Sequence, residues 1–360
     1  MYKRQGRKQA VIDRHERLLL NQLMSHGVTL LPGEAGFHDP HTLKLRRSNG
    51  EEVQLSAAVI VLATGSRPRR PADVPFDRER VLDSTSILKM RRLPRRLTVI
   101  GGGVIACEFA TIFAPLGVAV SLVDSHDHLL AYLDEDIQQT LESDLLDMGI
   151  QLHMNTRIKQ IRRMGEQVQL ETDSGIKMET DAVLYALGRE PNYTSLDLAA
   201  AGLDADDQGW VRINEHHQTG RPHIYIIGDL AGRPSLASTA MEQGRLAVNH
   251  AFDRDHALPA GQLPMAIYTI PELSYVGKTE RELQDGDIDF VIGRARFSET
   301  ARGQIIGEDR GFMKLLVDRT SRELLGVHII GESASELVHI GQMAMNCGAS
   351  VDLLANTVFN

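Results

Sequence analysis

Three consecutive glycines and a later aspartate carry the clearest chemistry in this 360-residue sequence. Gly101, Gly103 and Ala106 match the spacing G-x-G-x-x-G/A, and Asp124 follows at the distance typical of dinucleotide-binding units. The first glycine permits a tight turn, the second lets a pyrophosphate approach the backbone, and the small third residue lets helix and strand pack closely. Amides at the start of the helix then hold the phosphates. The pattern predicts a nicotinamide dinucleotide site; a glycine-rich turn without a ligand is the alternative.

The side chains around Asp124 bear on which dinucleotide is bound. A carboxylate there accepts hydrogen bonds from a ribose 2′-hydroxyl and repels a 2′-phosphate, so it favours NAD(H) over NADP(H). His126 and His128 follow within four residues and could supply positive charge near a 2′-phosphate. Imidazoles are mostly neutral at neutral pH, however, and two solvated loop histidines are the alternative interpretation.

Two further carboxylates and the two cysteines are the other side chains that could take part in chemistry. Asp229 follows a predicted strand, where it can accept hydrogen bonds from a sugar-alcohol chain or simply form a turn. Glu108 lies in an otherwise apolar helix, which argues against an ordinary solvent-facing carboxylate. Cys107 and Cys347 are far apart, so we expect neither a metal site nor a redox pair, and both should pack in the interior.

A strand, a turn, a helix and a second strand must position these residues. The sequence predicts strands at Leu97–Ile100 and Ala119–Val123, with a helix at Gly103–Phe113 between them. The whole stretch Leu97–Val123 is also long and apolar enough for a membrane span. Its glycines and Pro115 interrupt such a helix, so we expect no span there.

Hydrophobic periodicity predicts further elements on both sides of this unit. Helices are expected at 9–26, 134–148, 238–252 and 334–346. Strands are expected at 29–31, 42–45, 53–55, 57–63, 150–154, 158–164, 168–171, 182–186, 224–227, 275–276, 290–297, 311–317 and 324–330. The strands at 57–63 and 182–186 are both apolar and both end near Gly, Arg and Pro, which indicates two related nucleotide-binding lobes.

Composition narrows the classes of protein. A hydrophobic content of 42%, 31 glycines and 5% aromatic residues suit an α/β protein with many tight turns. The net charge of −9, without a basic face, argues against a nucleic-acid partner. Few cysteines and the absence of a recognisable signal peptide favour a reducing cytoplasm.

Several of these motifs resemble the flavoprotein disulfide reductase superfamily. The stretch Thr219–Asp229 is similar to its second FAD motif, and Thr64-Gly65 is similar to its first strand-exit motif. Tyr268–Glu272 and Val276–Glu280 resemble the start of its dimer-interface domain. Within the superfamily, four stretches look like the Si-specific pyridine nucleotide transhydrogenases: 129–134, 234–238, 293–297 and 301–305.

The resemblance implies a flavin side of the site. Asp229 would bind the flavin ribityl chain, and Thr64 and Gly65 would lie against FAD. The helix that starts near Ala237 would direct the positive end of its dipole toward the flavin.

The resemblance also implies a nicotinamide side. Gly188 occupies the strand-exit motif that lies there, and Glu108 matches a residue that pairs with a lysine and orients the nicotinamide over the flavin. Val104 falls where some relatives carry a gating tyrosine, so an aromatic ring is not available from this position.

The implied fold is α/β, with two Rossmann-like domains for FAD and NAD(P) and an α+β dimer-interface domain. The expected boundaries are 1–92 and 191–258 for the FAD domain, 93–190 for the NAD(P) domain and 259–360 for the interface domain. The implied activity is FAD-dependent hydride transfer between NADPH and NAD by a homodimer or larger homo-oligomer, with no catalytic dithiol. A dihydrolipoamide dehydrogenase or related disulfide reductase, and a flavin-free NAD-binding fragment without turnover, are the alternatives.

The sequence departs from the family pattern in two ways. The family's first FAD-binding βαβ unit is not found before Thr64, and its interface domain continues beyond Asn360, so we expect a chain truncated at both ends. Asp124 stands where the transhydrogenases would carry a neutral residue with arginines nearby, which predicts weaker use of NADP(H).

Overall fold

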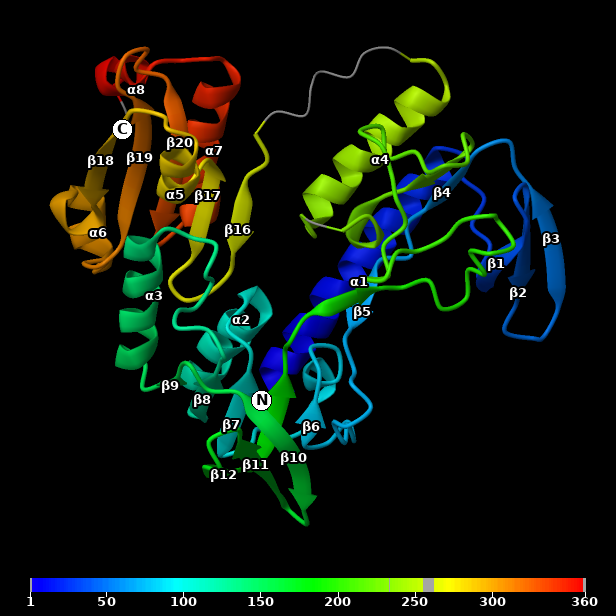
Figure 1. Cartoon of the computed structure of the whole chain (residues 1–360), viewed down its shortest axis with the longest axis horizontal. Coiled ribbons are helices and arrows are strands. Elements are labelled where there is room, and N and C mark those ends of the chain that lie inside the picture. Colours follow the sequence, from blue (N-terminus) through cyan, green and yellow to red (C-terminus); the bar gives the residue numbers. More distant parts are fainter. Residues whose placement is uncertain (1, 233, 255–261, 359–360) are drawn as a thin grey trace. The chain divides into compact units, whose positions relative to one another are not determined.

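A computed structural model describes residues 2–232, 234–254 and 262–358. The chain forms two compact units (Figure 1). Unit 1 comprises Met1–Arg67 and Arg189–Ala257, and unit 2 comprises Pro68–Gly188 and Leu258–Asn360. The sequence analysis set the start of the interface domain at residue 259, which lies outside the described residues.

Unit 2 contains a five-stranded parallel sheet in the order β6-β13-β7-β8-β9. Its strands are β6 (Val81–Leu82), β7 (Arg96–Ile100), β8 (Ala119–Val123), β9 (Gln151–His153) and β13 (Ala182–Tyr185). Strand β7 lies at the switch point of this doubly wound sheet, because the connections to its two neighbours run in opposite directions along the order. Its apolar residues Leu97 and Val99 are fully buried, as expected of a strand covered on both faces.

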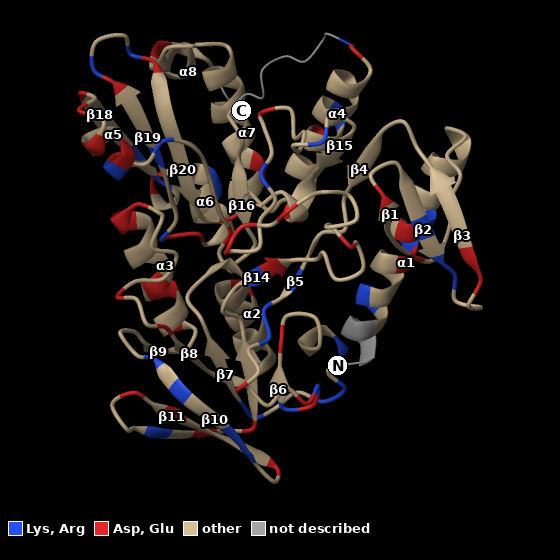
Figure 2. Ribbon diagram, turned by 45° about the vertical axis from the view of Figure 1, so that its right-hand side comes forward, with Lys and Arg blue, Asp and Glu red and all other residues tan. Residues whose placement is uncertain are grey.

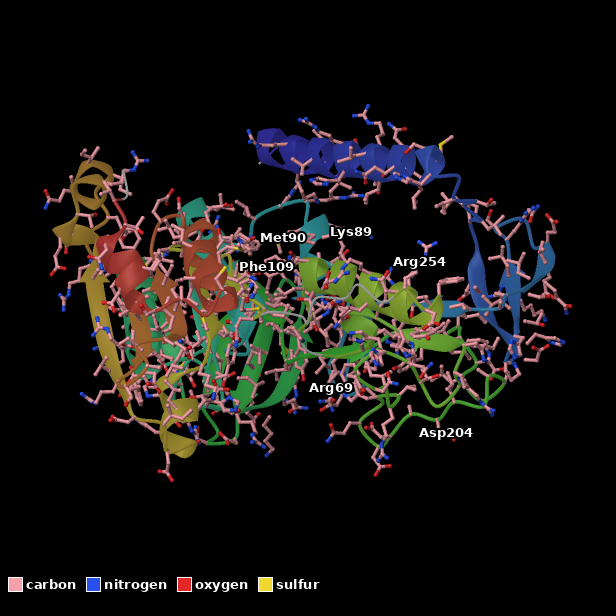
Figure 3. The ribbon with its side chains drawn as sticks, turned by 90° about the horizontal axis from the view of Figure 1, so that it is seen from above. Arg69, Lys89, Met90, Phe109, Asp204 and Arg254 are labelled. Atoms are coloured by element: carbon pink, nitrogen blue, oxygen red, sulfur yellow. The ribbon has the colours of Figure 1, made fainter. Side chains whose placement is uncertain are left out.

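Helices α2 (Val104–Phe113) and α3 (Glu135–Asp147) follow β7 and β8. Small and apolar side chains of α2 enter the main core of unit 2, with Ala106 and Ala110 fully buried. Phe109 of α2 and Met90, both labelled in Figure 3, pack against the edge of the same core. A separate antiparallel sheet consists of β10 (Ile158–Met164), β11 (Gln167–Thr172) and β12 (Lys177–Thr180).

The rest of unit 2 is built on an antiparallel sheet in the order β16-β17-β20-β19-β18. Its strands are β16 (Met265–Ile267), β17 (Leu273–Gly277), β18 (Phe290–Arg296), β19 (Phe312–Asp318) and β20 (Leu324–Ile330). Helix α7 (Ala334–Asn346) packs against β16, β17 and β20 (Figure 1). Three short helices complete this part: α5 (Glu280–Asp285), α6 (Ala301–Ile306) and α8 (Val351–Asn356).

Unit 1 is formed by small sheets and two long helices. Strands β1 (Glu34–Asp39), β2 (Thr42–Arg46) and β3 (Glu52–Ser56) form an antiparallel sheet. Strand β4 (Ile60–Leu62) pairs in parallel with β15 (Ile224–Ile226), and β5 (Ser66–Pro68) pairs with β14 (Arg189–Pro191). The helices are α1 (Tyr2–Ser25) and α4 (Ala237–Ala251), and Ile60, Ile224 and Leu230 belong to the core of this unit.

Most predicted elements are confirmed within two residues, but three predictions were wrong. Residues 29–31 are exposed and form no strand, because no neighbouring segment pairs with them. The strand predicted at 57–63 is limited to β4, the part that β15 pairs with. The helix predicted at 9–26 begins earlier, and its apolar residues, such as Leu18 and Met24, remain exposed.

The long apolar stretch Leu97–Val123 folds as β7, a turn, α2 and β8, as predicted. In the described part of the chain, no helix combines the length and the apolar character needed to cross a membrane.

Candidate functional site

The glycine turn lies at the carboxyl end of β7. Gly101 has φ of +123°, a conformation that other residues rarely adopt, and its N–H donates to the Val123 carbonyl at 2.8 Å. A Cβ atom at Gly101 would lie 2.9 Å from the Ala186 carbonyl oxygen at the end of β13. Glycine is therefore required here both by the backbone conformation and by the neighbouring strand.

Gly188 lies two residues beyond this contact and has φ of +93°. Its carbonyl oxygen accepts the N–H of Arg69 at 3.2 Å. The contact between Gly101 and Ala186 brings the exits of β7 and β13 together at one edge of the parallel sheet. This edge, outside the carboxyl ends of the strands at the switch point, is where doubly wound sheets bind their ligands.

Gly103 is the N-cap of α2 and provides no capping side chain. The first N–H groups of an α-helix have no partner within the helix, so those of α2 are available to a ligand. A Cβ atom at Gly103 would meet nothing within 4 Å, which means that the chain itself does not require glycine here. Val104 is half-buried and Ala106 is completely buried, which fits the close helix–strand packing that the motif predicts.

Gly102 is the residue of this turn that the sequence analysis missed. Its Cβ atom would lie 3.0 Å from Cγ of Asp124, so the carboxylate sits directly against the turn. The Gly102 carbonyl accepts the N–H of Leu130 at 2.9 Å, which holds the following loop against the same turn. The motif accepts any residue at this position, so the spacing of the glycines could not predict the contact with Asp124.

Asp124 follows β8, and its side chain is only 5% exposed. Its Oδ1 atom accepts two hydrogen bonds from His126, one from the backbone N–H at 2.7 Å and one from Nδ1 at 2.6 Å. His128 instead lies with Nδ1 3.3 Å from Oε1 of Glu142 on α3. The structure therefore joins Asp124 with His126 and directs His128 elsewhere.

Glu108 lies on α2 and is half-buried. Its Oε1 atom accepts the backbone N–H of Tyr268, just after β16, at 2.9 Å. Burial raises the pKa of the Glu108 carboxyl above its ordinary range, and the hydrogen bond from Tyr268 opposes that shift. A side chain held this way is not the freely solvated carboxylate that was the alternative.

The two cysteines are both free thiols. Cys107 is fully buried next to the glycine turn, as predicted, and burial raises its pKa strongly. The prediction that Cys347 packs in the interior was wrong, because this residue follows the last turn of α7 and is exposed.

In unit 1, a second group of polar side chains surrounds Asp229, which lies in the 3-10 turn Gly228–Leu230, three residues after the end of β15. Ser66 Oγ donates to Asp229 Oδ2 at 2.6 Å, and Arg189 Nε lies 2.7 Å from Ser66 Oγ and 3.9 Å from Asp229 Oδ2. The carboxylate is about one-third exposed, so it retains room for a ligand hydroxyl. Ser66 and Arg189 were not singled out from the sequence, because the contact depends on pairing between β5 and β14.

The remaining predicted flavin residues also lie in unit 1. Gly65 has φ of +71°, and its carbonyl accepts the N–H of Asn192 at 2.9 Å, while Thr64 Oγ1 donates to the Asn192 carbonyl at 2.7 Å. Ala237 is the exposed first residue of α4, whose N-terminus has no side-chain cap. Gln243 on α4 accepts the Gly228 N–H at 2.7 Å, which ties this helix to the end of β15.

Two other features of unit 2 do not involve the predicted site residues. A cavity of about 480 Å³ is lined by residues of α3, β18 and the loop before β19, including Arg294, Arg296 and Arg310. The carboxylates of Asp134, Asp136 and Glu280 lie close enough to hold a cation, but all three contact the ammonium group of Lys314.

Two segments of the chain match known protein families. Residues 4–244 match the family described as pyridine nucleotide-disulphide oxidoreductase. Residues 263–360 match the dimerisation domain described for the same proteins.

Individual relatives agree with these matches. The chain is 41% identical to a soluble pyridine nucleotide transhydrogenase of Mycobacterium bovis, over 99% of this chain and 76% of that protein. It is 40% identical to the enzyme of the same name from Vibrio atlanticus, over 99% of this chain and 77% of that protein. Among solved structures, LpdA from Mycobacterium tuberculosis matches with a TM-score of 0.93 and 27% identity, over 99% of this chain and 79% of that one. The flavoprotein disulfide reductase RclA from Escherichia coli has the same fold, with a TM-score of 0.92 at 24% identity over 99% and 82% of the two chains.

Proposed function

Because the chain belongs to the pyridine nucleotide-disulphide oxidoreductase family, we propose that it transfers hydride between NADPH and NAD with FAD as the relay. The observation that carries this proposal is the identity of 41% with a soluble pyridine nucleotide transhydrogenase along almost the whole chain. The dinucleotide-binding turn at Gly101–Gly103 supplies the physical basis for one half of the reaction, since it can hold the pyrophosphate of either nicotinamide dinucleotide.

The residues of unit 1 fit an FAD molecule. The partly exposed carboxylate of Asp229 can accept hydrogen bonds from ribityl hydroxyls, and Ser66 and Arg189 hold its position. The uncapped start of α4 at Ala237 offers amides and a positive dipole end, which stabilise negative charge nearby. When bound, FAD supplies a site that can take hydride from one nicotinamide and give it to another, so no dithiol is needed.

The residues of unit 2 would bind and orient the nicotinamide dinucleotide. The α2 amides after Gly103 would hold the pyrophosphate, and Asp124 would contact the adenosine ribose next to Gly102. Glu108 lies further along the same helix, where its carboxylate is held by Tyr268. We assign Glu108 the role of orienting the nicotinamide ring, because a fixed carboxylate limits the poses that the ring can adopt.

The family match and the cysteines also bear on the oligomeric state and the cellular location of the protein. The match of residues 263–360 to the dimerisation domain supports a homodimer or a larger homo-oligomer. We also propose a cytoplasmic location, since two unpaired cysteines suit a reducing compartment.

Stopped-flow spectroscopy of the purified, FAD-loaded chain tests the proposal. NADPH should bleach the flavin absorbance within the enzyme's turnover time, and NAD+ added afterwards should restore it while NADH appears. If NADH reduces the flavin and NADPH does not, the transhydrogenase function is wrong. Reduction of lipoamide or another disulfide at a comparable rate would favour the alternative of a disulfide reductase, and a chain that binds NADH but no flavin would favour a binding module.

A further inference from the structure

The cavity of about 480 Å³ in unit 2 has no role in the proposed hydride transfer. Its described lining residues include none of those that we assign to FAD or to the nicotinamide dinucleotide. Helix α3 forms one wall and lies beside β18 and β19 (Figure 1), because Asp136 pairs with Arg294 at 2.8 Å and with Lys314 at 2.6 Å. The volume falls within the range of about 300–1,000 Å³ that is typical of small-molecule sites.

Asp144 of α3 brings an unsatisfied oxygen to this cavity. Its side chain is only 7% exposed, and its Oδ1 atom accepts Nη1 of Arg310 at 3.4 Å. Its Oδ2 atom is buried and has no hydrogen-bond partner in the described part of the chain. Burial raises the pKa of the Asp144 carboxyl above its ordinary range, and Arg310 opposes that shift. A buried carboxylate oxygen without a donor is costly, so a ligand that donates a hydrogen bond here would stabilise it.

Arg296 of β18 brings a cation to the same cavity. Side chains two residues apart in a strand point to the same face, so Arg296 lies on the face of Arg294, toward α3. Arg294 already pairs with Asp136, and Arg310 already pairs with Asp144. The guanidinium of Arg296 forms no ion pair with any residue that the structure describes. It is therefore the group that is most available to an anionic ligand.

The rest of the lining indicates what such a ligand is made of. Among the described lining residues, Phe312 is the only apolar one, so a nucleobase would find little apolar surface. The exposed carboxylate of Asp309 also lines the cavity and, like Asp144, can only accept hydrogen bonds when ionised. Hydroxyl groups supply donors to such carboxylates. A phosphate monoester carries about two negative charges and three acceptor oxygens, which a guanidinium binds through two parallel hydrogen bonds.

From this arrangement we propose that the cavity binds a phosphorylated polyol, such as a sugar phosphate. Arg296 binds the phosphate, next to the paired guanidinium of Arg294. Asp144 and Asp309 accept hydrogen bonds from the hydroxyl groups of the polyol. The inference goes beyond the proposed function, since it requires neither FAD nor a nicotinamide dinucleotide.

Isothermal titration of the purified full chain with glucose 6-phosphate and with glycerol 3-phosphate tests the inference. At least one of these probes should bind with a Kd of about 1 mM or lower. Glucose and inorganic phosphate should each bind at least about tenfold more weakly than that probe, because each lacks one half of the hydrogen-bonding groups.

Two variants locate the binding to this cavity. Arg296→Gln should weaken binding of the better probe by about tenfold or more, the loss expected when a charge-assisted hydrogen bond is removed. Asp144→Asn keeps an acceptor for Arg310 but replaces the second oxygen with a donor, so it should weaken the polyol phosphate by about tenfold and leave inorganic phosphate unchanged. Arg302→Gln is the matched control, because Arg302 is an exposed arginine on α6 that does not line the cavity. Titration with NAD+ shows whether each variant is folded, and exposed Asp309→Asn replaces Asp144→Asn if the latter is not.

Three results would overturn the inference. The first is a Kd above about 1 mM for both phosphorylated probes. The second is equal affinity for inorganic phosphate and for the better probe, which would mean that the hydroxyl groups are not recognised. The third is unchanged affinity in Arg296→Gln, which would place the phosphate at another site, such as the glycine turn.

Discussion

The carboxylate of Glu108 accepts the backbone N–H of Tyr268 at 2.9 Å, so a residue of the parallel-sheet domain is held by the first loop of the antiparallel one. This hydrogen bond orients the side chain that we assign to the nicotinamide. Since both partners lie in unit 2, the contact belongs to one compact part of the molecule.

Glu108→Gln keeps the size of the side chain and its acceptor oxygen but removes the charge. We expect flavin reduction by NADPH to slow by roughly tenfold to a hundredfold, because a misoriented nicotinamide reacts poorly even when bound. The dissociation constant for NADPH should change much less, since the pyrophosphate contacts are intact. Stopped-flow reduction across a range of NADPH concentrations separates the two quantities. An equal change in both would show that Glu108 contributes to binding rather than orientation, and exposed Glu135→Gln on α3 is the matched control.

The raised pKa of Glu108 also predicts a pH-dependent stability difference. A carboxyl whose pKa is higher in the folded state than its ordinary value of 4.5 stabilises the fold at low pH, and that contribution is lost as pH rises through the folded pKa. Glu108→Gln cannot ionise at this side chain, so its melting temperature should rise relative to that of the unmodified chain as the pH increases above 4.5, until the folded carboxyl is fully ionised. Thermal melts monitored by circular dichroism at several pH values measure this gap. A gap that shrinks with rising pH would contradict the assigned direction of the shift.

The nucleotide-binding half of the site could be predicted closely from the sequence. Gly101, Gly103, Ala106 and Asp124 occupy the strand end, helix cap, core and next strand end that the motif requires, because these roles follow from local backbone geometry. The contact of Gly102 with Asp124 could not be predicted, since the motif places no requirement on that residue.

The flavin half depended more on resemblance and on long-range contacts. Asp229 was recognised from a motif, but Ser66 and Arg189 join it only because distant segments pair as β5 and β14. The predicted ends of the strand at 57–63 were wrong for a related reason. The run at 57–63 is apolar throughout, yet only the part facing β15 has a partner, and pairing rather than hydrophobicity decides where a strand ends.

Alanine at Gly103 distinguishes a ligand requirement from a folding requirement. A Cβ atom there meets nothing within 4 Å in the chain, and the φ of −85° suits alanine, so stability should change by less than about 1 kcal/mol. The same atom would obstruct a pyrophosphate, and we expect NAD+ to bind roughly tenfold more weakly or worse. Calorimetric titration and thermal melts give both quantities. Gly220, in unit 1, also has open space at its Cβ position, so Gly220→Ala is a control that should change neither stability nor NAD+ binding. Normal NAD+ binding by Gly103→Ala would show that the pyrophosphate binds elsewhere.

The buried ammonium of Lys314 gives a prediction about stability. Its Nζ atom lies 2.7 Å from Asp134, 2.6 Å from Asp136 and 2.8 Å from Glu280, and the side chain is fully buried. Burial disfavours the charged form, but these three carboxylates outweigh it and raise the pKa of Lys314. Figure 2 shows the acidic positions on α3, the helix that this lysine on β19 connects to the antiparallel sheet.

Lys314→Met should therefore be strongly destabilising, because it leaves three clustered carboxylates without their common cation. Removing one partner of a buried ion pair typically lowers the free energy of unfolding by about 3–5 kcal/mol, and we expect a loss of that size for unit 2. Arg319→Met is the matched control, since Arg319 pairs with Asp289 on the exposed surface and should contribute less than about 1 kcal/mol. Urea unfolding followed by circular dichroism compares the two variants. Equal, small losses in both would mean that the carboxylates around Lys314 are protonated or solvated in the folded chain, and that the lysine does not connect α3 to the sheet.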